Sequence, residues 1–264
     1  MNAYLGYSVS VVALGAWGSD LAAQQGPPPI ADNSFLIEEA YNQEAGVVQH
    51  ISAFHRSLRA AAWTYTFTQE WPVVVQRHQL SFTLPVERIG GAGATVTGIG
   101  DIALNYRYQL VGGDGAVAVA PRLSLLLPTG SEANGSGSGA FGVQVNLPVS
   151  ATLAPRFVAH GNAGWSTAAG ADEYGLGASV VWLTGPTFNV LVEAVWSHAD
   201  GGGEALVVNP GVRWAHNFAS GLQIVPGIAF PIGIGPSRGE RGAFLYLSFE
   251  HPFRRAVSSN RGPP

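Results

Sequence analysis

The residues that could perform acyl-transfer chemistry are serines and histidines that lie close together in the chain. Such a reaction needs a serine and a histidine within hydrogen-bond reach and a third group that orients the histidine. No Gly-x-Ser-x-Gly motif is present, and adjacent residues of a strand point to opposite faces, so this chemistry is only a weak alternative. The candidate pairs are His50 with Ser52, His160 with Ser166, and Ser197 with His198.

Metal and phosphate chemistry have less support in the sequence. The histidines follow neither His-x-x-x-His nor His-Glu-x-x-His spacing, and cysteine is absent. The glycine-rich stretches at 98–100 and 135–139 are not followed by Gly-Lys-Ser/Thr, and the chain contains no lysine. We therefore expect no metal, no cofactor and no enzymatic activity.

A third group of polar side chains could line a passage for solutes. These side chains recur at every second position, on the register opposite to large apolar residues, and they carry charges of both signs. Near Asp101, Arg107 and Arg122 they could form a constriction, or they could be a network of paired charges that braces the wall. The lumen-lining candidates are Asp101, Asn105, Arg107, Arg122, Gln144, Asn146, His160, Glu193, Arg213 and Glu250. The same register is predicted for His50, Arg56, Glu70, Asn162, Asn209 and Gln223.

The elements that carry these residues have a period of two from about residue 46 onward. For example, Ile102, Leu104 and Tyr106 alternate with smaller or polar residues. Segments of this kind run for about ten residues, which is long enough for a tilted strand to cross a bilayer. They are predicted at 46–57, 62–71, 77–86, 99–110, 116–128, 140–151, 156–166, 173–183, 187–198, 205–215, 221–234 and 242–253.

Composition favours the same architecture. Only 11% of the 264 residues are charged and 35 are glycines, yet no apolar run long enough for a spanning helix follows the first two dozen positions. The sequence therefore predicts an all-β fold, a transmembrane antiparallel up-and-down β-barrel of about twelve strands in the bacterial outer membrane. A net charge of −4 gives no basic surface for nucleic acid.

Connections and tryptophans agree with a barrel. Loops at 87–98, 129–139, 167–172, 199–204 and 235–241 are predicted outside, with mostly shorter turns in the periplasm. Six tryptophans fall on the outward register near predicted strand ends, as the aromatic girdles of such barrels require. These predicted membrane-interface aromatics are Trp63, Trp71, Trp165, Trp182, Trp196 and Trp214.

The chain divides into four predicted segments. Residues 1–23 are typical of a signal peptide that ends in Leu21-Ala22-Ala23. Residues 24–45 either hang in the periplasm or fold inward as a plug, and 46–253 form the barrel. The strand that ends at Phe253 resembles the C-terminal assembly signal of outer-membrane barrels, and 254–264 are predicted to be a disordered tail. Expected partners are outer-membrane lipid and lipopolysaccharide, the barrel assembly machinery, and a small solute of unknown identity.

Three stretches resemble a family of bacterial meta-pathway phenol-degradation proteins, also called transporters. They are 37–44 (IEEAYNQE), 98–108 (GIGDIALNYRY) and 127–130 (LPTG). The resemblance spans roughly residues 34 to 253 and implies an outer-membrane barrel, with a link to aromatic compounds. The leading hypothesis is passive passage or binding of small, hydrophobic or aromatic solutes. The alternatives are a closed structural or surface-interaction barrel and, less favoured, an outer-membrane lipid hydrolase.

Overall fold

The computed structural model describes residues 29–252, except for residues 61, 91–94, 113–114 and 221. The predicted signal peptide, the C-terminal tail and Phe253 lie outside this range. The strands are β1 (Val47–Ser57), β2 (Trp63–Val73), β3 (Val75–Gly90), β4 (Thr95–Ile99), β5 (Ile102–Tyr108), β6 (Val117–Val119), β7 (Arg122–Leu127), β8 (Gly142–Ala154), β9 (Phe157–Ala168), β10 (Ala171–Gly185), β11 (Phe188–Ala199), β12 (Gly203–Trp214), β13 (His216–Asn217), β14 (Gln223–Ala229), β15 (Ile232–Gly233) and β16 (Gly242–Pro252).

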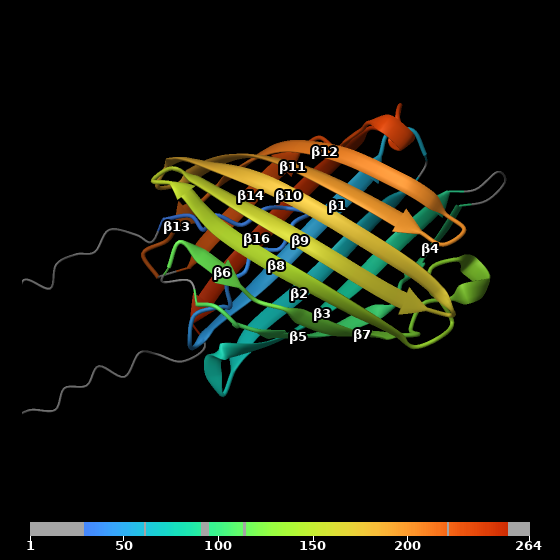
Figure 1. The fold of residues 1–264 in the computed structure, drawn as a ribbon, viewed down its shortest axis with the longest axis horizontal. Coiled ribbons are helices and arrows are strands. Elements are labelled where there is room, and N and C mark those ends of the chain that lie inside the picture. The colour runs from blue at the N-terminus through green and yellow to red at the C-terminus, as the bar shows by residue number, and fades with distance from the viewer. Residues whose placement is uncertain (1–28, 61, 91–94, 113–114, 221, 253–264) are drawn as a thin grey trace, which may run out of the picture.

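These strands form one closed antiparallel barrel (Figure 1). Closure comes from β1, which pairs with β2 on one side and with β16 on the other. Three positions around the barrel, here called walls like the single strands, are each occupied by two strands in line. These are β4 with β5, β6 with β7, and β14 with β15, which pair with the single neighbours β3, β8 and β12. The described chain therefore forms twelve walls, which confirms the predicted twelve-stranded barrel.

Two of these three breaks have a local cause. Pro121 separates β6 from β7, and Pro231 separates β14 from β15. Proline lacks the N–H that a central strand must donate to its neighbour, so the ladder stops and restarts around it. The predicted continuous strands at 116–128 and 221–234 are therefore each divided into two.

Two predicted loops are partly strand. Pairing of β3 with β4 continues to Gly90 opposite Thr95, so much of the 87–98 connection is a hairpin that extends the wall. Strand β9 pairs with β10 up to Ala168 opposite Ala171. Only Ala169 and Gly170 join those two strands, with φ of 51° and 81°, the left-handed pair that a tight two-residue hairpin requires.

The two ends of the barrel differ in their connections. One end, here called the turn end, carries short connections such as Pro155-Arg156 and Pro186-Thr187. The other, here called the loop end, carries the long connections 128–141 and 234–241. Both ends of the described chain lie at the turn end (Figure 1).

The two faces of the wall are opposite in character. Large apolar side chains such as Leu104, Leu123 and Val143 are exposed on the outside, whereas buried residues facing inward are mostly Gln, Asn, Ser, Arg and Glu. A water-soluble domain has the reverse arrangement, and an apolar belt around a polar interior is the pattern of a barrel in lipid. This outward belt and the closed sheet place the protein in the bacterial outer membrane.

Within the described residues, no α-helix has the length and apolar character needed to cross a membrane.

Candidate functional site in the barrel lumen

Residues 30–43, here called the lumenal segment, run through the interior of the barrel without regular secondary structure. Ile30 begins at the turn end, where its N–H donates to the carbonyl of Pro186 over 2.8 Å. Ile37 and Ala40, at 4% and 0% exposure, are enclosed by the walls. Of the two positions predicted for 24–45, the described part adopts the inward one.

Backbone N–H groups of the lumenal segment are satisfied by wall side chains rather than by each other. The carboxylate Oε1 of Glu193 accepts from the N–H of Phe35, Leu36 and Ile37 at 2.9, 2.7 and 3.1 Å. Three consecutive N–H groups that converge on one oxygen form the concave anion site called a nest. The second oxygen of Glu193 accepts from Asn209 over 2.7 Å.

Further N–H groups are bound one by one along the segment. Ser150 Oγ accepts from Ala40, Gln109 from Asn42 and Gln79 from Gln43, at 2.8, 2.9 and 2.7 Å. Since irregular backbone away from water needs a partner for each polar group, these side chains make the conformation of the segment possible.

Two wall arginines bind the carbonyl groups of the segment. Arg107 donates from Nη1 to the carbonyl of Glu39 and from Nη2 to that of Tyr41, at 3.2 and 2.6 Å. Arg213 Nη1 donates to the carbonyl of Asn33 over 2.6 Å, and its guanidinium lies 4.9 Å from the ring centre of Tyr246. Arg213 is only 1% exposed. Both arginines therefore act as anchors for the backbone.

Apolar side chains of the segment fit places where the wall has glycine. The Phe35 ring packs on Phe244 and Tyr246, with centroid distances of 5.3 and 5.4 Å. A Cβ added to Gly227 would lie 2.6 Å from that ring, so any side chain there would displace it. Gly177 stands in the same relation to Ile37. Wall and segment are thus shaped to each other.

A charged cluster lies where the segment faces β5 and β7. Glu38 is 2.6 Å from Arg122 Nη2 and 3.9 Å from Arg107 Nη1. Glu70 is 3.9 Å from Arg107 Nη2 and accepts from Gln79. The cluster therefore links wall charges with a carboxylate of the segment.

A buried serine and histidine also contact the segment. Ser150 and His160 are 0% and 2% exposed, and their Oγ and Nδ1 are 2.7 Å apart. His160 Nε2 donates to the carbonyl of Asp32 over 3.0 Å, so Nδ1 accepts from the Ser150 hydroxyl. The third group is a backbone carbonyl and the serine also accepts from Ala40, so the pair holds the segment. None of the three predicted pairs contains Ser150.

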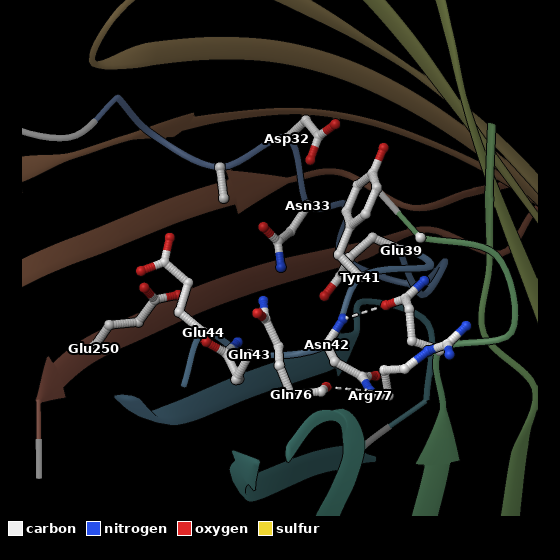
Figure 2. A pocket seen from close by; sticks show the side chains of 13 residues that line it. Asp32, Asn33, Glu39, Tyr41, Asn42, Gln43, Glu44, Gln76, Arg77 and Glu250 are labelled. Carbon is white, nitrogen blue, oxygen red and sulfur yellow. Dashed lines mark hydrogen bonds between the residues drawn. The ribbon is translucent and has the colours of Figure 1, made fainter. Parts of the chain in front are cut away.

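The segment lies between cavities that open towards the two ends. A cavity of about 640 Å³ at the turn end is bordered by four carboxylates and by Arg77 (Figure 2). Cavities of about 190 and 220 Å³ lie on its loop-end side and meet at Glu38 and Arg122. The four carboxylates are those of Asp32, Glu39, Glu44 and Glu250.

Most of the predicted lumen-lining residues face this interior. Arg122 donates to Asn105 and Gln144, Asn146 donates to Asn162, and Gln49 donates to Glu250. The predicted residues found on the inward register are Asn105, Arg107, Arg122, Gln144, Asn146, His160, Glu193, Arg213 and Glu250, together with Glu70, Asn162, Asn209 and Gln223.

The assignment of His50 and Arg56 to the lumen is wrong. In β1 the buried inward residue is Gln49, and the His50 ring stacks on Phe249 of the outer face with centroids 4.6 Å apart. Arg56 is exposed opposite Trp63. This strand has polar and apolar residues on both faces, so its alternation does not fix the register.

Asp101 does not join the charged cluster and instead binds the long loop at the loop end. Its carboxylate accepts from the N–H groups of Gly130 and Ser138, at 2.9 and 2.7 Å, and from the Ser138 hydroxyl. Thr129 Oγ1 donates to the carbonyl of Gly100. The stretches 98–101 and 129–130 therefore meet in one structural junction.

We expect Asp101→Asn to loosen the loop around 129–138. Partial burial would raise the pKa of Asp101, but the hydrogen bonds from Ser138 and Gly130 outweigh it and lower that pKa below its usual value. A depressed pKa means that the stabilisation is present above the unfolded-state pKa and is lost as the pH falls through the folded one. Amide hydrogen exchange of the loop should accelerate in the variant; unchanged exchange would contradict this role.

All six predicted interface tryptophans lie on the outward register. Each is an odd number of positions from an inward residue of its own strand, as Trp196 is from Glu193 and Trp214 from Arg213. Trp71 and Trp182 pack on Phe82 and Phe157, with centroid distances of 6.3 and 6.2 Å. Trp63, Trp165 and Trp196 lie towards the loop end, and Trp71, Trp182 and Trp214 towards the turn end.

Sequence reasoning missed several inward residues. Gln49, Gln79 and Asn189 are at most 2% exposed. Each is separated by an even number of positions from another inward residue of its strand, which is the signal that could have identified it. Among the described residues, no group of three or more His, Asp or Glu is placed to hold a metal.

A closed twelve-wall barrel with an apolar exterior and a hydrogen-bonded polar interior is an outer-membrane barrel of porin-like fold. No family model matches the sequence, and no curated protein matches it either. The phenol-degradation family itself therefore stays a prediction.

Solved structures of similar fold include one outer membrane channel and two porins. The COG4313 outer membrane channel from Pseudomonas putida F1 has a TM-score of 0.56 and 14% identity, over 80% of this chain and 97% of that one. The KdgM porin has a TM-score of 0.51 and 7% identity, over 76% and 98%. The NanC porin has a TM-score of 0.50 and 9% identity, over 76% and 98%. At such identities the likeness defines the fold alone.

Proposed function

We propose that this protein is a passive diffusion channel of the outer membrane for small solutes, narrowed by its lumenal segment. The observation that carries the proposal is that polar cavities from both ends of the barrel reach the same irregular segment. The segment is held mainly by side chains, and no wall strand must separate for it to move. Its displacement would join the cavities into one path.

The orientation and the solute class are part of the proposal. The turn end faces the periplasm, since transmembrane barrels carry short turns there, and the loop end faces lipopolysaccharide. Insertion by the barrel assembly machinery is the route we expect. The resemblance of residues 37–44 and 98–108 to the phenol-degradation family favours hydrophobic or aromatic solutes.

A closed barrel is the second candidate, and the dense hydrogen bonding of the segment favours it. If Glu193, Arg107 and Arg213 hold the backbone of the lumenal segment in every state of the protein, no solute passes through the lumen. This candidate assigns the protein a structural or surface-interaction role.

Planar-bilayer recording on the purified, refolded full chain separates the two. The channel proposal expects small, discrete current steps, and partial block when phenol, but not glycerol at equal concentration, is added. A protein that is β-rich and heat-modifiable yet electrically silent would overturn the channel and leave the closed barrel. If phenol and glycerol affect the conductance equally, the proposed preference for aromatic solutes is overturned and the channel proposal remains.

A further inference from the structure

Arg122 differs from the other lumenal arginines in the partners it has. Its Nη1 donates to Asn105 Oδ1 and Ser124 Oγ at 2.9 and 3.0 Å, and its Nη2 donates to Gln144 Oε1 at 2.8 Å. These wall partners are all neutral. Among the described residues, the carboxylate within ion-pair distance is that of Glu38, at 2.6 Å. The wall therefore orients the guanidinium without neutralising it.

Glu38 is a movable partner for this charge. Its backbone is fixed by Asn162, which accepts from the N–H and donates to the carbonyl, each over 2.8 Å. Within the described part of the chain, its carboxylate forms ion pairs with Arg107 and Arg122, and the side chain is 31% exposed. The carboxylate can thus swing away from Arg122 while the segment stays docked.

Arg122 also borders open space, because it lines both loop-end cavities. The cavity of about 190 Å³ is lined by three threonines, by the apolar side chains of Leu36 and Tyr246, and by two arginines together with three glutamates. The threonines are Thr66, Thr68 and Thr83, and the charged residues are Arg107, Arg122, Glu38, Glu39 and Glu70. The cavity is smaller than a typical drug-sized pocket. A small organic molecule with one anionic end and a partly apolar body suits these walls.

We propose that Arg122 binds the carboxylate of small organic acids in the lumen, and that Glu38 is its built-in competitor. Planar guanidinium and carboxylate groups form paired hydrogen bonds of high directionality, and a carboxylate from solution can take over the contacts that Glu38 makes now. The proposal rests on the diffusion-channel function and names the solute class that the channel retains.

The other two anchoring arginines do not fit this role. Arg107 donates from Nε to Asn42 Oδ1 and from its terminal nitrogens to backbone carbonyls of the segment. Arg213 is buried beneath Asn33 and Tyr246. Arg107 also lines the smaller loop-end cavity, but its side chain is only 5% exposed, against 17% for Arg122, and Arg213 is 1% exposed.

The test measures benzoate binding to the full chain in detergent micelles by isothermal titration calorimetry, with benzamide as the neutral molecule of the same shape. We expect Glu38→Gln to tighten benzoate binding about tenfold, since a tethered competitor acts at high effective concentration. Arg122→Gln should weaken it at least about tenfold. Benzamide should respond to neither substitution.

Two matched controls sharpen the result. Glu44→Gln removes the same charge from the same stretch of chain but lies at the turn-end cavity, and Arg88→Gln removes an exposed arginine of β3. Both should leave benzoate binding unchanged. Heat-modifiable migration of each variant establishes that it has folded.

Every result decides the proposal. Benzoate affinity unaffected by Arg122→Gln overturns the site, and affinity equal in the wild type and Glu38→Gln overturns the competitor. Binding as expected in a protein silent in bilayers supports the site and overturns the channel. A conducting protein that does not distinguish benzoate from benzamide overturns the site and leaves the channel.

Discussion

Glu193→Ala should raise the single-channel open probability at least about tenfold. The substitution removes the acceptor of three consecutive N–H groups and leaves Asn209 without its partner. Hydrogen bonds to a charged group contribute about 1.5–3 kcal/mol each. Since the three donors share one oxygen, we expect a loss of about 3 kcal/mol of docking free energy, roughly a hundredfold in the equilibrium constant between the docked and the displaced segment.

Glu193→Gln and Glu204→Ala serve as comparisons for this prediction. Glutamine keeps a neutral acceptor at the nest, so its open probability should lie between those of the wild type and Glu193→Ala. Glu204 is exposed at the start of β12, and its replacement should change nothing. If Glu193→Ala folds and its openings match the wild type, the segment is not the barrier.

The barrel could be predicted because its signal is repeated in every wall. Lipid on one side forces large apolar residues such as Leu104 and Leu123 to every second position, and the alternation fixes register and length together. The signal fails where this force is weak. In β1, His50 and Phe54 share the outer face while Ile51 and Ala53 pack inward, so neither face is uniformly apolar.

The lumenal cluster was predicted only in part, because alternation assigns a side of the wall but not a partner. Asp101 has the same parity as Asn105 and Arg107, yet it lies in the break between β4 and β5 and binds the loop at Gly130 and Ser138. Hydrogen bonds over more than a hundred positions, such as Glu193 to Leu36, depend on barrel closure. Period and composition carry no information on such pairs.

The position of the lumenal segment could not be chosen from its own residues. The apolar and acidic side chains of residues 30–43 follow no regular period. Such a sequence is compatible with an extended periplasmic segment as well as with a plug. The deciding features are in the wall: Gly177 and Gly227 leave room for Ile37 and Phe35, and Arg107 reaches the segment carbonyls. Each is an ordinary strand residue until the barrel is assembled.

Deleting residues 30–45 should increase the conductance severalfold and reduce selectivity for cations. Residues 30–45 carry four acids and no base, namely Asp32, Glu38, Glu39 and Glu44. The wall charges deep in the lumen are balanced, with Arg107, Arg122 and Arg213 against Glu70, Glu193 and Glu250. Charge lining a narrow aqueous path selects ions of opposite sign. The permeability ratio of potassium to chloride should fall towards one.

Neutralising the four acids without deleting the segment separates its charge from its bulk. The variant Asp32→Asn, Glu38→Gln, Glu39→Gln and Glu44→Gln retains the backbone that Glu193, Ser150 and Arg107 bind, so its conductance should stay near that of the wild type. Its selectivity should nevertheless fall like that of the deletion. Reversal potentials in a potassium chloride gradient measure the ratio. The deletion removes both the bulk and the charge of the segment, whereas the neutralised variant removes the charge alone. A deletion that folds but gains no conductance would therefore refute the steric role, and unchanged reversal potentials in the neutralised variant would refute the electrostatic one.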